Sequence, residues 1–418
     1  MAVTRRRFLA LGAGGLLAGV AGGAGAAWYG LRNPCRVRLP DRLRDHPLVR
    51  AAFARLDPAR IVDAHVHLVG VGAGGTGAWV NPSMTSWAHP IRGAKFLFYR
   101  NAACITDLDR ADQDYADRLV ALKREAFPDP GAKLLLLAFD HAYAGDGTVD
   151  LADSEFYVPA AYVFQLAAAH PDDFLPATSI HPYRADALDA LDAHAAAGAR
   201  AVKWLPNAQR IDPADPRCRP FYEKLAHLGI PLLTHAGEEQ AVEADEAQLL
   251  GNPLRLRAAL EAGATVIVAH CASLGTSPDL DRADQAVADN FELFLRLMAE
   301  PRWVGRLWGD VSALPQFNRC GEPLRRLLLS PELHGRLING SDYPLPGVNP
   351  VIRTSTLVDR GYITAEERAV LNELFEWNAL LFDFVLKRTL RVAEGGVEHR
   401  FADEIFQRRD FFTRVARP

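Results

Sequence analysis

Ile61-Val-Asp-Ala-His-Val-His67 is a short apolar run that ends in two histidines, and four later runs of the chain are built in a similar way. Each run is rich in Val, Ile or Leu and is bounded by Gly, Pro or charged residues, as expected of a strand buried on both faces. Each also places a potential metal ligand at or near its carboxyl end. The other four runs are Ala201-Val-Lys-Trp-Leu205, Pro231-Leu-Leu-Thr-His235, Thr265-Val-Ile-Val-Ala-His270 and Leu337-Ile-Asn-Gly-Ser-Asp342.

The position of these polar residues indicates that they meet in space. In a barrel of parallel strands, the carboxyl ends of the strands and the loops that follow them converge around one pocket. Residues i and i+2 of a strand face the same side, so His65 and His67 are expected to point inward together. Two imidazoles on one face can bind one ion. The sequence therefore predicts a metal site at the mouth of a barrel.

Eight apolar runs alternate along the chain with segments of helical periodicity. Strand followed by helix, repeated, implies a parallel sheet, and eight repeats imply closure. We therefore predict an α/β fold, a (β/α)8 TIM barrel with a C-terminal helical extension. The expected strands are Arg60–His67, Lys133–Phe139, Phe174–His181, Arg200–Leu205, Ile230–His235, Thr265–His270, Arg306–Ser312 and Arg336–Ser341. The expected helices are Asp109–Phe127, Glu155–His170, Ala185–Ala197, Phe221–Leu228, Pro253–Ala262 and Arg282–Met298.

The length of 418 residues, about half of them hydrophobic, suits one large core. We expect the barrel at 57–387, after a basic linker at 28–56 and before a charged, irregular tail at 388–418. The extension is a helical segment from Ala365 to Lys387 that packs on the barrel. The Gly-rich, aromatic segment from Val69 to Thr106 is expected to be a loop. It either covers the pocket or plugs the top of the barrel with its aromatic side chains.

The first 27 residues are expected to direct the protein out of the cytoplasm. Thr4-Arg5-Arg6-Arg7-Phe8-Leu9 precedes a Gly/Ala-rich apolar stretch and is similar to a twin-arginine export signal, with a cleavage site at Ala24-Gly25-Ala26. The alternative is an uncleaved anchor, since the stretch from Phe8 to Trp28 comes close to the ~20 apolar residues that span a bilayer. Both interpretations place the bulk of the protein in the periplasm or another extracytoplasmic space.

Charge and cysteine content narrow the functional classes further. The formal net charge is −4 and no long basic run occurs, so a small molecule rather than a nucleic acid is the expected partner. Outside the N-terminal segment, which would engage the twin-arginine machinery or the membrane, we expect no membrane contact. The five cysteines lack paired spacing and are expected to be unbonded, buried small hydrophobes. They are Cys35, Cys104, Cys218, Cys271 and Cys320.

The order of these groups resembles the amidohydrolase superfamily, over about Asp57 to Phe384. Its pattern is His-x-His, Lys, His, His and Asp on strands one, four, five, six and eight. The surrounding sequence is similar to the amidohydrolase-2 branch of metal-dependent TIM-barrel hydrolases, which also contains decarboxylases related to aminocarboxymuconate-semialdehyde decarboxylase. The most specific pieces are Asp63-Ala-His-Val-His67, Val202-Lys-Trp-Leu-Pro-Asn207, Thr234-His-Ala-Gly237 and Gly340-Ser-Asp-Tyr-Pro344.

The resemblance implies a ligand set of His65, His67, His235 and Asp342. Three imidazoles, one carboxylate and an open position suit one divalent ion, with zinc expected. Asp342 would also move the proton of the attacking water, and His270 would stabilise the developing oxyanion. If Lys203 is carbamylated and bridges two ions, a second metal is present.

The expected activity is hydrolysis of a carbonyl, ester, lactone or amide carbon by a metal-bound water. The alternative is metal-dependent non-oxidative decarboxylation of an aromatic or unsaturated carboxylic acid, and a third hypothesis is a non-catalytic binding protein. Further pocket residues are predicted just beyond the strands. Glu238 either orients a ligand histidine or caps the next helix. The remaining substrate-binding candidates are His141, His181, Asn207 and Tyr343.

Overall fold

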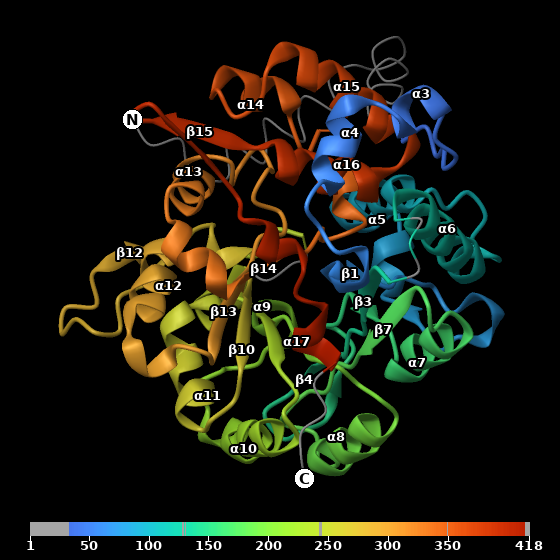
Figure 1. Ribbon diagram of the computed structural model, residues 1–418. Helices are drawn as coiled ribbons and strands as arrows, with labels where there is room; N and C mark the ends of the chain where they lie inside the picture. The colour runs from blue at the N-terminus through green and yellow to red at the C-terminus, as the bar shows by residue number, and fades with distance from the viewer. Residues whose placement is uncertain (1–32, 128, 130, 242–244, 349, 414–418) are drawn as a thin grey trace.

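The computed structural model describes residues 33–127, 129, 131–241, 245–348 and 350–413, so the expected signal or anchor at 1–27 lies outside the described residues. Within these ranges, eight parallel strands alternate with helices, and the predicted (β/α)8 barrel is confirmed (Figure 1). The strands are β1 (Val62–His67), β3 (Lys133–Leu137), β7 (Phe174–Ala177), β8 (Val202–Trp204), β9 (Leu232–His235), β10 (Val266–Ala269), β13 (Leu307–Asp310) and β14 (Leu337–Ile338).

The barrel strands form two hydrogen-bonded arcs, in the orders β1-β3-β7 and β8-β9-β10-β13-β14. Isolated bridges join the arcs at their two seams. Thr178 pairs with Val202 between β7 and β8, and Val66 pairs with Tyr343 between β1 and the segment after β14. The spatial order of the strands therefore follows the order of the chain, and the first and last strands become neighbours.

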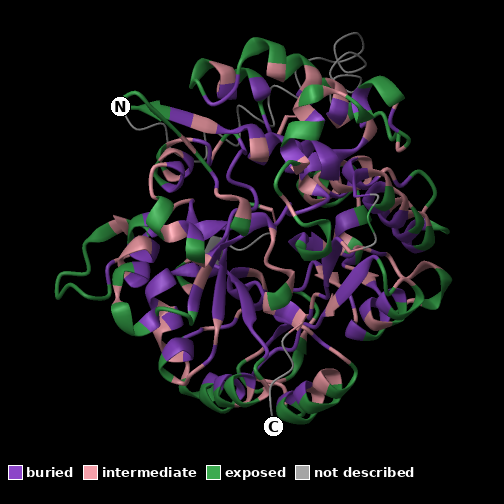
Figure 2. Cartoon of the chain, in the orientation of Figure 1, coloured by how far each residue is buried: buried purple, intermediate pink, exposed green. Residues whose placement is uncertain are grey.

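Helices surround the strands, and Figure 2 shows the strands buried between them. No helix of the described ranges is long and apolar enough to cross a membrane. The main helices are α6 (Ala111–Ala126), α7 (Ala160–Ala169), α8 (Ala187–Ala196), α10 (Arg219–Leu228), α11 (Arg257–Glu261), α12 (Asn290–Ala299), α13 (Glu322–Leu328), α14 (Thr354–Asp359), α15 (Ala365–Trp377) and α16 (Ala379–Thr389). Further helices are α3 (Asp41–Arg44), α4 (Pro47–Phe53) and α9 (Pro206–Gln209).

The expected C-terminal extension consists of α15 and α16, which local capping separates. Thr364 and Glu367 form a reciprocal capping box at the start of α15. Asn378 ends α15 and caps α16 by accepting a hydrogen bond from the Leu381 amide. The Asn378 side chain also donates to the Leu122 carbonyl of α6, which ties the extension to the barrel helices.

The inside of the barrel is filled by an inner cluster that is separate from the larger core between strands and helices. Its members come from the barrel strands and their ends, with one aromatic ring added from α17 (Arg409–Thr413). That ring is Phe412, only 2% exposed. The inner cluster comprises Val62, Ala64, Leu135, Leu137, Leu175, Ala177, Ala201, Leu233, Ile267, Ala269, Ile338 and Phe412.

The expectation of a loop from Val69 to Thr106 is wrong for its second half. This segment contains the 14-residue helix α5 (Pro90–Ala103), which begins at Pro90 and ends at Cys104 in the left-handed conformation. Proline at the first turn favours helix initiation. Three of the aromatic residues of this segment, Phe96, Phe98 and Tyr99, lie on this helix, and Phe96 is buried. Trp79 lies in the short strand β2 (Trp79–Val80), which pairs with β6 (Phe156–Tyr157).

The expectation that all five cysteines are unbonded is also wrong. Cys35 and Cys104 form a disulfide across 69 residues, whereas Cys218, Cys271 and Cys320 are free and buried as predicted. The pairing depends on where α5 ends relative to the linker, and no local spacing reveals that. The bond fixes Cys35 of the linker to the end of α5.

Two further segments are more ordered than expected. The predicted helix Arg282–Met298 begins only at Asn290, because residues before it form a hairpin of β11 (Thr276–Pro278) and β12 (Val287–Asp289). After Lys387, the irregular tail contains a hairpin of β15 (Arg391–Glu394) and β16 (Val397–Arg400) and then α17. Another small hairpin joins β4 (Ala142–Tyr143) and β5 (Val149–Asp150).

Replacing the ring that completes the inner cluster should destabilise the protein. Phe412→Ala is expected to lower the free energy of unfolding by about 3–5 kcal/mol, the usual cost of removing a buried aromatic side chain. Val397→Ala, at a side chain that is 56% exposed, is the control and should change it by less than about 0.5 kcal/mol. Urea denaturation of both variants tests this, and equal effects would mean that Phe412 does not support the barrel.

Candidate metal centre

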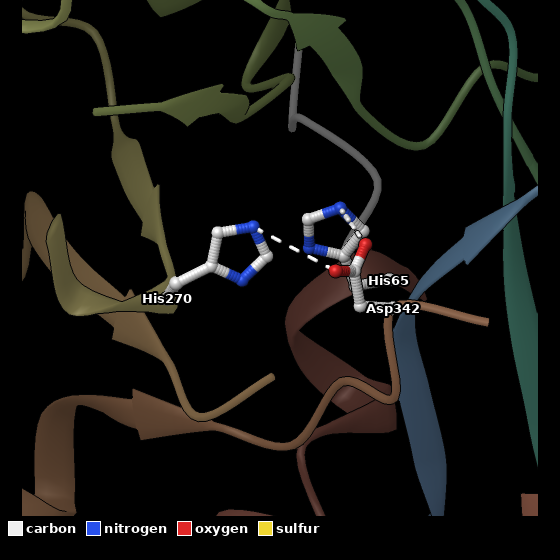
Figure 3. Close-up of side chains that lie close together, drawn as sticks. All are labelled: His65, His270 and Asp342. Atoms are coloured by element: carbon white, nitrogen blue, oxygen red, sulfur yellow. Dashed lines mark ion pairs between the residues drawn. The ribbon is translucent and has the colours of Figure 1, made fainter. Parts of the chain in front are cut away.

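Three strand-end side chains meet at the carboxyl end of the barrel. His65 of β1, His270 after β10 and Asp342 after β14 place one ligand atom each within 4.8 Å of one another (Figure 3). The Nε2 atom of His65 is 3.5 Å from Oδ1 of Asp342, and that of His270 is 4.0 Å from Oδ2. All three side chains are buried. They form a compact cluster of nitrogen and oxygen donors.

The other residues expected at the centre lie around this cluster. His67 Nε2 is 3.2 Å from Asp342 Oδ1, and the ring centroids of His235 and His270 are 5.4 Å apart. The Lys203 amine is 3.1 Å from His65 Nε2. The structure therefore brings together all six residues singled out for the centre, from five different barrel strands and their ends.

Each of three buried imidazoles is held through its Nδ1 atom. His65 Nδ1 is 2.8 Å from the carboxylate of Asp310 and His270 Nδ1 is 2.7 Å from the Ser312 hydroxyl. A carboxylate, that of Glu239, also lies 3.5 Å from Nδ1 of His235. A partner on Nδ1 fixes the ring and leaves Nε2 available as a ligand.

The electrostatic environment keeps these imidazoles neutral. Burial lowers the pKa of His65 well below its usual value, and Lys203 acts in the same direction. Burial and Arg319 lower the pKa of His270 in the same way. For His235, burial lowers the pKa to about 4 although Glu239 opposes it. Neutral imidazole is the form that binds a metal.

Asp342 is the charged member of the cluster. Burial alone would raise its pKa, but the hydrogen bond from His67 and the electrostatic interactions with His65, His67 and Lys203 outweigh burial, so the pKa is lowered. Lys203 is itself buried, which lowers the pKa of its amine against the pull of Asp310 and Asp342.

Unusual backbone conformations set the direction of two of these side chains. His270, Cys271 and Ala272 have φ values of 54°, 50° and 49°, and Asp342 has a φ of 63°. Non-glycine residues rarely adopt this region, and such strain is concentrated at functional sites. The chain thus turns sharply at the ends of β10 and β14, where a ligand side chain must leave the strand direction.

A register shift in β1 places His65 at the centre. The pairing of β1 with β3 shifts between Asp63 and Val66. As a result, Ala64 belongs to the inner cluster while the next residue, His65, lines the cavity above it. The Asp63 carboxylate accepts hydrogen bonds from the amides of His65 and Ser341, which secures this irregular stretch against the end of β14.

The donor set fits a divalent metal ion. Nε2 of His235 is buried without a hydrogen-bond partner in the described ranges, an arrangement that is costly unless the atom serves a ligand. Several neutral imidazoles around one ionised carboxylate match the nitrogen and oxygen ligands of a catalytic transition-metal site. His65, His67, His235, His270 and Asp342 are therefore the candidate ligands.

A cavity of about 330 Å³ opens over the cluster. Its walls are mostly apolar and aromatic, and include Phe96 and Tyr99 of α5. Arg319, 6% exposed, brings a cation into this wall and donates to the Ser273 hydroxyl at 3.1 Å. The cavity therefore combines a metal-type cluster, an apolar surface and a buried guanidinium.

The predicted substrate-binding residues lie outside the lining of this cavity. His141 stacks on Tyr157, with centroids 4.1 Å apart. His181 donates from Nε2 to the Gln209 carbonyl, and its Nδ1 accepts from the Tyr183 amide. Both rings therefore pack against protein groups outside the cavity lining. The other candidates outside the lining are Asn207, Glu238 and Tyr343.

Glu238 was expected to orient a ligand histidine or to cap a helix. In the structure, the acid that lies beside His235 is its neighbour Glu239. Asn207 donates to the Gly237 carbonyl at 3.3 Å and so supports the loop after β9. Tyr343 is buried near Tyr115, with centroids 6.1 Å apart.

Four important residues were not singled out from the sequence: Asp310, Ser312, Glu239 and Arg319. A signal existed for the first two, since the predicted strand Arg306–Ser312 ends in a carboxylate and a hydroxyl at the active end of the barrel. Asp310 also accepts from the His270 amide at 2.9 Å, so one carboxylate positions two histidines. Arg319 lies in the loop beyond β13, where no strand-end rule applies.

Comparison with known proteins identifies one family over most of the barrel. The family model described as "Amidohydrolase" matches residues 62–380. No curated protein matches the chain.

Several solved structures are similar at low identity. An uncharacterized TIM-barrel protein from Bordetella bronchiseptica is 16% identical, covers 68% of this chain and 86% of its own, and has a TM-score of 0.44. A suggested 2-pyrone-4,6-dicarboxylic acid hydrolase from Pseudomonas putida is 17% identical, covers 83% and 97%, and scores 0.39. A 5-carboxyvanillate decarboxylase from Sphingomonas paucimobilis is 12% identical, covers 83% and 99%, and scores 0.37. At this low identity, these structural similarities do not indicate which reaction the protein catalyses.

Removing the carboxylate that positions His65 should weaken metal binding. Asp310→Asn keeps the shape of the side chain but loses the charge that fixes His65 Nδ1, so metal affinity is expected to fall about 10–100-fold. Competition with a chromophoric chelator measures this, with circular dichroism as a check on folding. The exposed Asp284→Asn is the control, and an unchanged affinity in Asp310→Asn would contradict the positioning role.

The burial of His181 predicts a pH dependence of stability. Burial lowers its pKa to about 4, against the hydrogen bond to the Gln209 carbonyl. In the unfolded chain a histidine takes up a proton near pH 6.5, whereas folded His181 does not until about pH 4. As the pH is lowered from about 6.5 to about 4, the free energy of unfolding should therefore decrease. This one group contributes up to about 1.4 kcal/mol per pH unit.

The variant His181→Asn should lose that part of the slope, although it is less stable at neutral pH. Urea denaturation at several pH values between these limits measures the slope. His89→Gln, at an exposed histidine, is the matched control. A slope in His181→Asn equal to that of the parent protein would exclude His181 as a contributor.

Proposed function

Because this chain belongs to the amidohydrolase family of metal-dependent enzymes, we propose that it is a hydrolase that attacks a carbonyl, ester, lactone or amide carbon of a small molecule. The observation that carries the proposal is the position of Asp342. Its ionised carboxylate lies between the Nε2 atoms of His65, His67 and His270, at the floor of an apolar cavity. A carboxylate in that position can accept the proton of an attacking water.

We propose that His65, His67, His235 and Asp342 hold one divalent ion, with zinc as the expected metal. Such an ion would supply Lewis-acid chemistry, making water more acidic and polarising an oxygen of the substrate. His270 also belongs to the compact cluster, so it can serve either as a further ligand or as a group that contacts the substrate. In the second role, its Nε2 stabilises negative charge on the reacting oxygen while Ser312 holds its Nδ1.

Lys203 decides the metal count in this proposal. Its lowered pKa favours the neutral amine, the form that reacts with carbon dioxide to give a carbamate. The Lys203 amine lies 3.1 Å from His65 Nε2, so a carbamate there would reach the same cluster and could bridge two ions. An unmodified Lys203 would instead leave a one-metal centre.

One observation favours the second candidate, decarboxylation of an aromatic or unsaturated carboxylic acid. Arg319 is a buried cation in the wall of a mostly apolar, aromatic cavity, and its Nε atom lacks a hydrogen-bond partner in the described ranges. A guanidinium binds a carboxylate strongly in such surroundings. This would hold an acid substrate over the same cluster.

We also propose that the protein functions outside the cytoplasm after export through the twin-arginine machinery. The disulfide between Cys35 and Cys104 supports this location, because disulfides persist in oxidising compartments. The N-terminal sequence that motivates the proposal lies outside the described residues.

Metal analysis tests the number of ions in the centre. The purified protein is expected to contain one zinc ion per chain and an unmodified Lys203, by elemental analysis and mass spectrometry. Two ions with a mass increase of one carbon dioxide on Lys203 would contradict the one-metal proposal.

A substrate panel decides between the two reactions. Lactones, esters, amides and aromatic acids are incubated with metal-loaded protein while acid release and carbon dioxide are recorded. Hydrolysis without carbon dioxide is expected. On the best substrate, Asp342→Asn should lower kcat by about 10²–10⁴-fold, the usual contribution of a general base. The exposed Asp284→Asn is the control. Full activity in Asp342→Asn, or carbon dioxide release, would contradict the proposed hydrolysis.

A further inference from the structure

The segment from Pro82 to Ala103 exposes large apolar side chains to the outside. Trp87 is 99% exposed, Ile91 66% and Leu97 47%. Single exposed apolar residues are ordinary, but these three lie within 11 residues of the chain, on α5 and just before it. A fully exposed tryptophan beside them makes this surface a candidate interaction site.

The exposed residues of α5 form a stripe. Ile91, Ala94 and Leu97 are spaced by three residues, which places them on one side of a helix, and all three are exposed. The helical position of Lys95 flanks this stripe on one side. Arg100 flanks it on the other side, where it also lines the cavity and donates to the Thr106 carbonyl at 3.0 Å. An apolar stripe bordered by cations is the arrangement of a helix that lies in a membrane interface.

The charge of the surrounding chain supports the same partner. Between Ala64 and Thr106 the sequence contains no Asp or Glu, although it contains Arg92, Lys95 and Arg100. A stretch of that length without an acidic residue is attracted to negatively charged lipid headgroups. Tryptophan, moreover, is enriched at the level of the headgroups.

The disulfide holds the linker at Asn33–Cys35 against the end of α5. Cys35 is bonded to Cys104 at the end of α5, and Asn33 donates from its amide to the Asn101 side chain. The apolar stretch that ends at Trp28 is only five residues from Asn33, so its end can lie no more than about 17 Å from Asn33. If that stretch enters a bilayer, α5 is held close to the lipid.

The opposite side of α5 faces the cavity. Phe96, Tyr99 and Ala103 line it, and the Tyr99 hydroxyl donates to the Ala241 carbonyl at 2.6 Å. The helix is therefore a wall with the cavity on one side and the exposed stripe on the other.

We propose that the surface formed by Trp87, Ile91 and Leu97, with Lys95 and Arg100 at its edges, docks into the headgroup region of a membrane that contains anionic phospholipid. This inference goes beyond the proposed reaction and does not depend on it. Docking would orient the barrel with α5, one wall of the cavity, against the lipid.

The test uses the full chain with vesicles of phosphatidylethanolamine and phosphatidylglycerol, with and without brominated acyl chains. The fluorescence that is lost in Trp87→Phe is attributed to Trp87. We expect brominated lipid to quench that component, and quenching to weaken when phosphatidylcholine replaces phosphatidylglycerol. Because the readout belongs to Trp87 alone, it reports on this surface even if the N-terminal stretch also binds the vesicles. Absence of quenching would overturn the proposal.

Paired variants test the stripe. In Ile91→Gln, the lipid concentration required for quenching of Trp87 should rise about tenfold, because one buried aliphatic side chain is lost from the contact. Val287→Gln, at a residue of β12 that is 72% exposed, is the matched control. Equal effects of the two variants would overturn the proposal. The proposal would also be overturned if the protein self-associates without lipid and Ile91→Gln abolishes this self-association. The stripe would then bind a second copy of the chain.

Discussion

The backbone bonds between β1 and the end of β14 are the constraint on which the candidate metal centre depends. The Ala64 amide donates to the Asn339 carbonyl, the Asp342 amide to the His65 carbonyl and the His67 amide to the Tyr343 carbonyl. These bonds close the barrel at one seam. They also fix Asp342 beside two histidines that lie near the other end of the barrel sequence. A carboxylate buried without such neighbours would be costly to ionise.

Contacts behind the histidines fix the orientation of their rings in the candidate metal centre. Asp310 accepts from the His270 amide and holds the His65 ring, while Ser312 holds the His270 ring. The imidazoles are therefore fixed in orientation and kept neutral by burial, with Nε2 directed to a common centre. The strained residues at the ends of β10 and β14 serve the same geometry. Local strain is tolerated there because it lets side chains from separate strands converge.

The covering side of the barrel was the least predictable part. The sequence from Val69 to Thr106 has the glycine content of a loop at its start, but its second half becomes α5. Its outward stripe and its cavity-facing aromatics become distinguishable only once the helix is placed. The position of the linker likewise depends on distant contacts, since Cys35 is bonded to Cys104 and Asn33 donates to Asn101 of α5.

The sequence by itself determined the eight strands, their order and the residues at their ends, because burial on both faces of a strand leaves a local pattern of apolar runs. The same local pattern marks the six residues of the candidate centre, which are His65, His67, Lys203, His235, His270 and Asp342. Only the tertiary structure decided which neighbours act on them. Glu239 rather than Glu238 meets His235 because the chain turns at Gly237, where φ is 94°. His141 and His181 end the same kinds of runs yet point to structural partners, since contacts between distant segments, and not the local pattern, set the direction of a side chain beyond its strand.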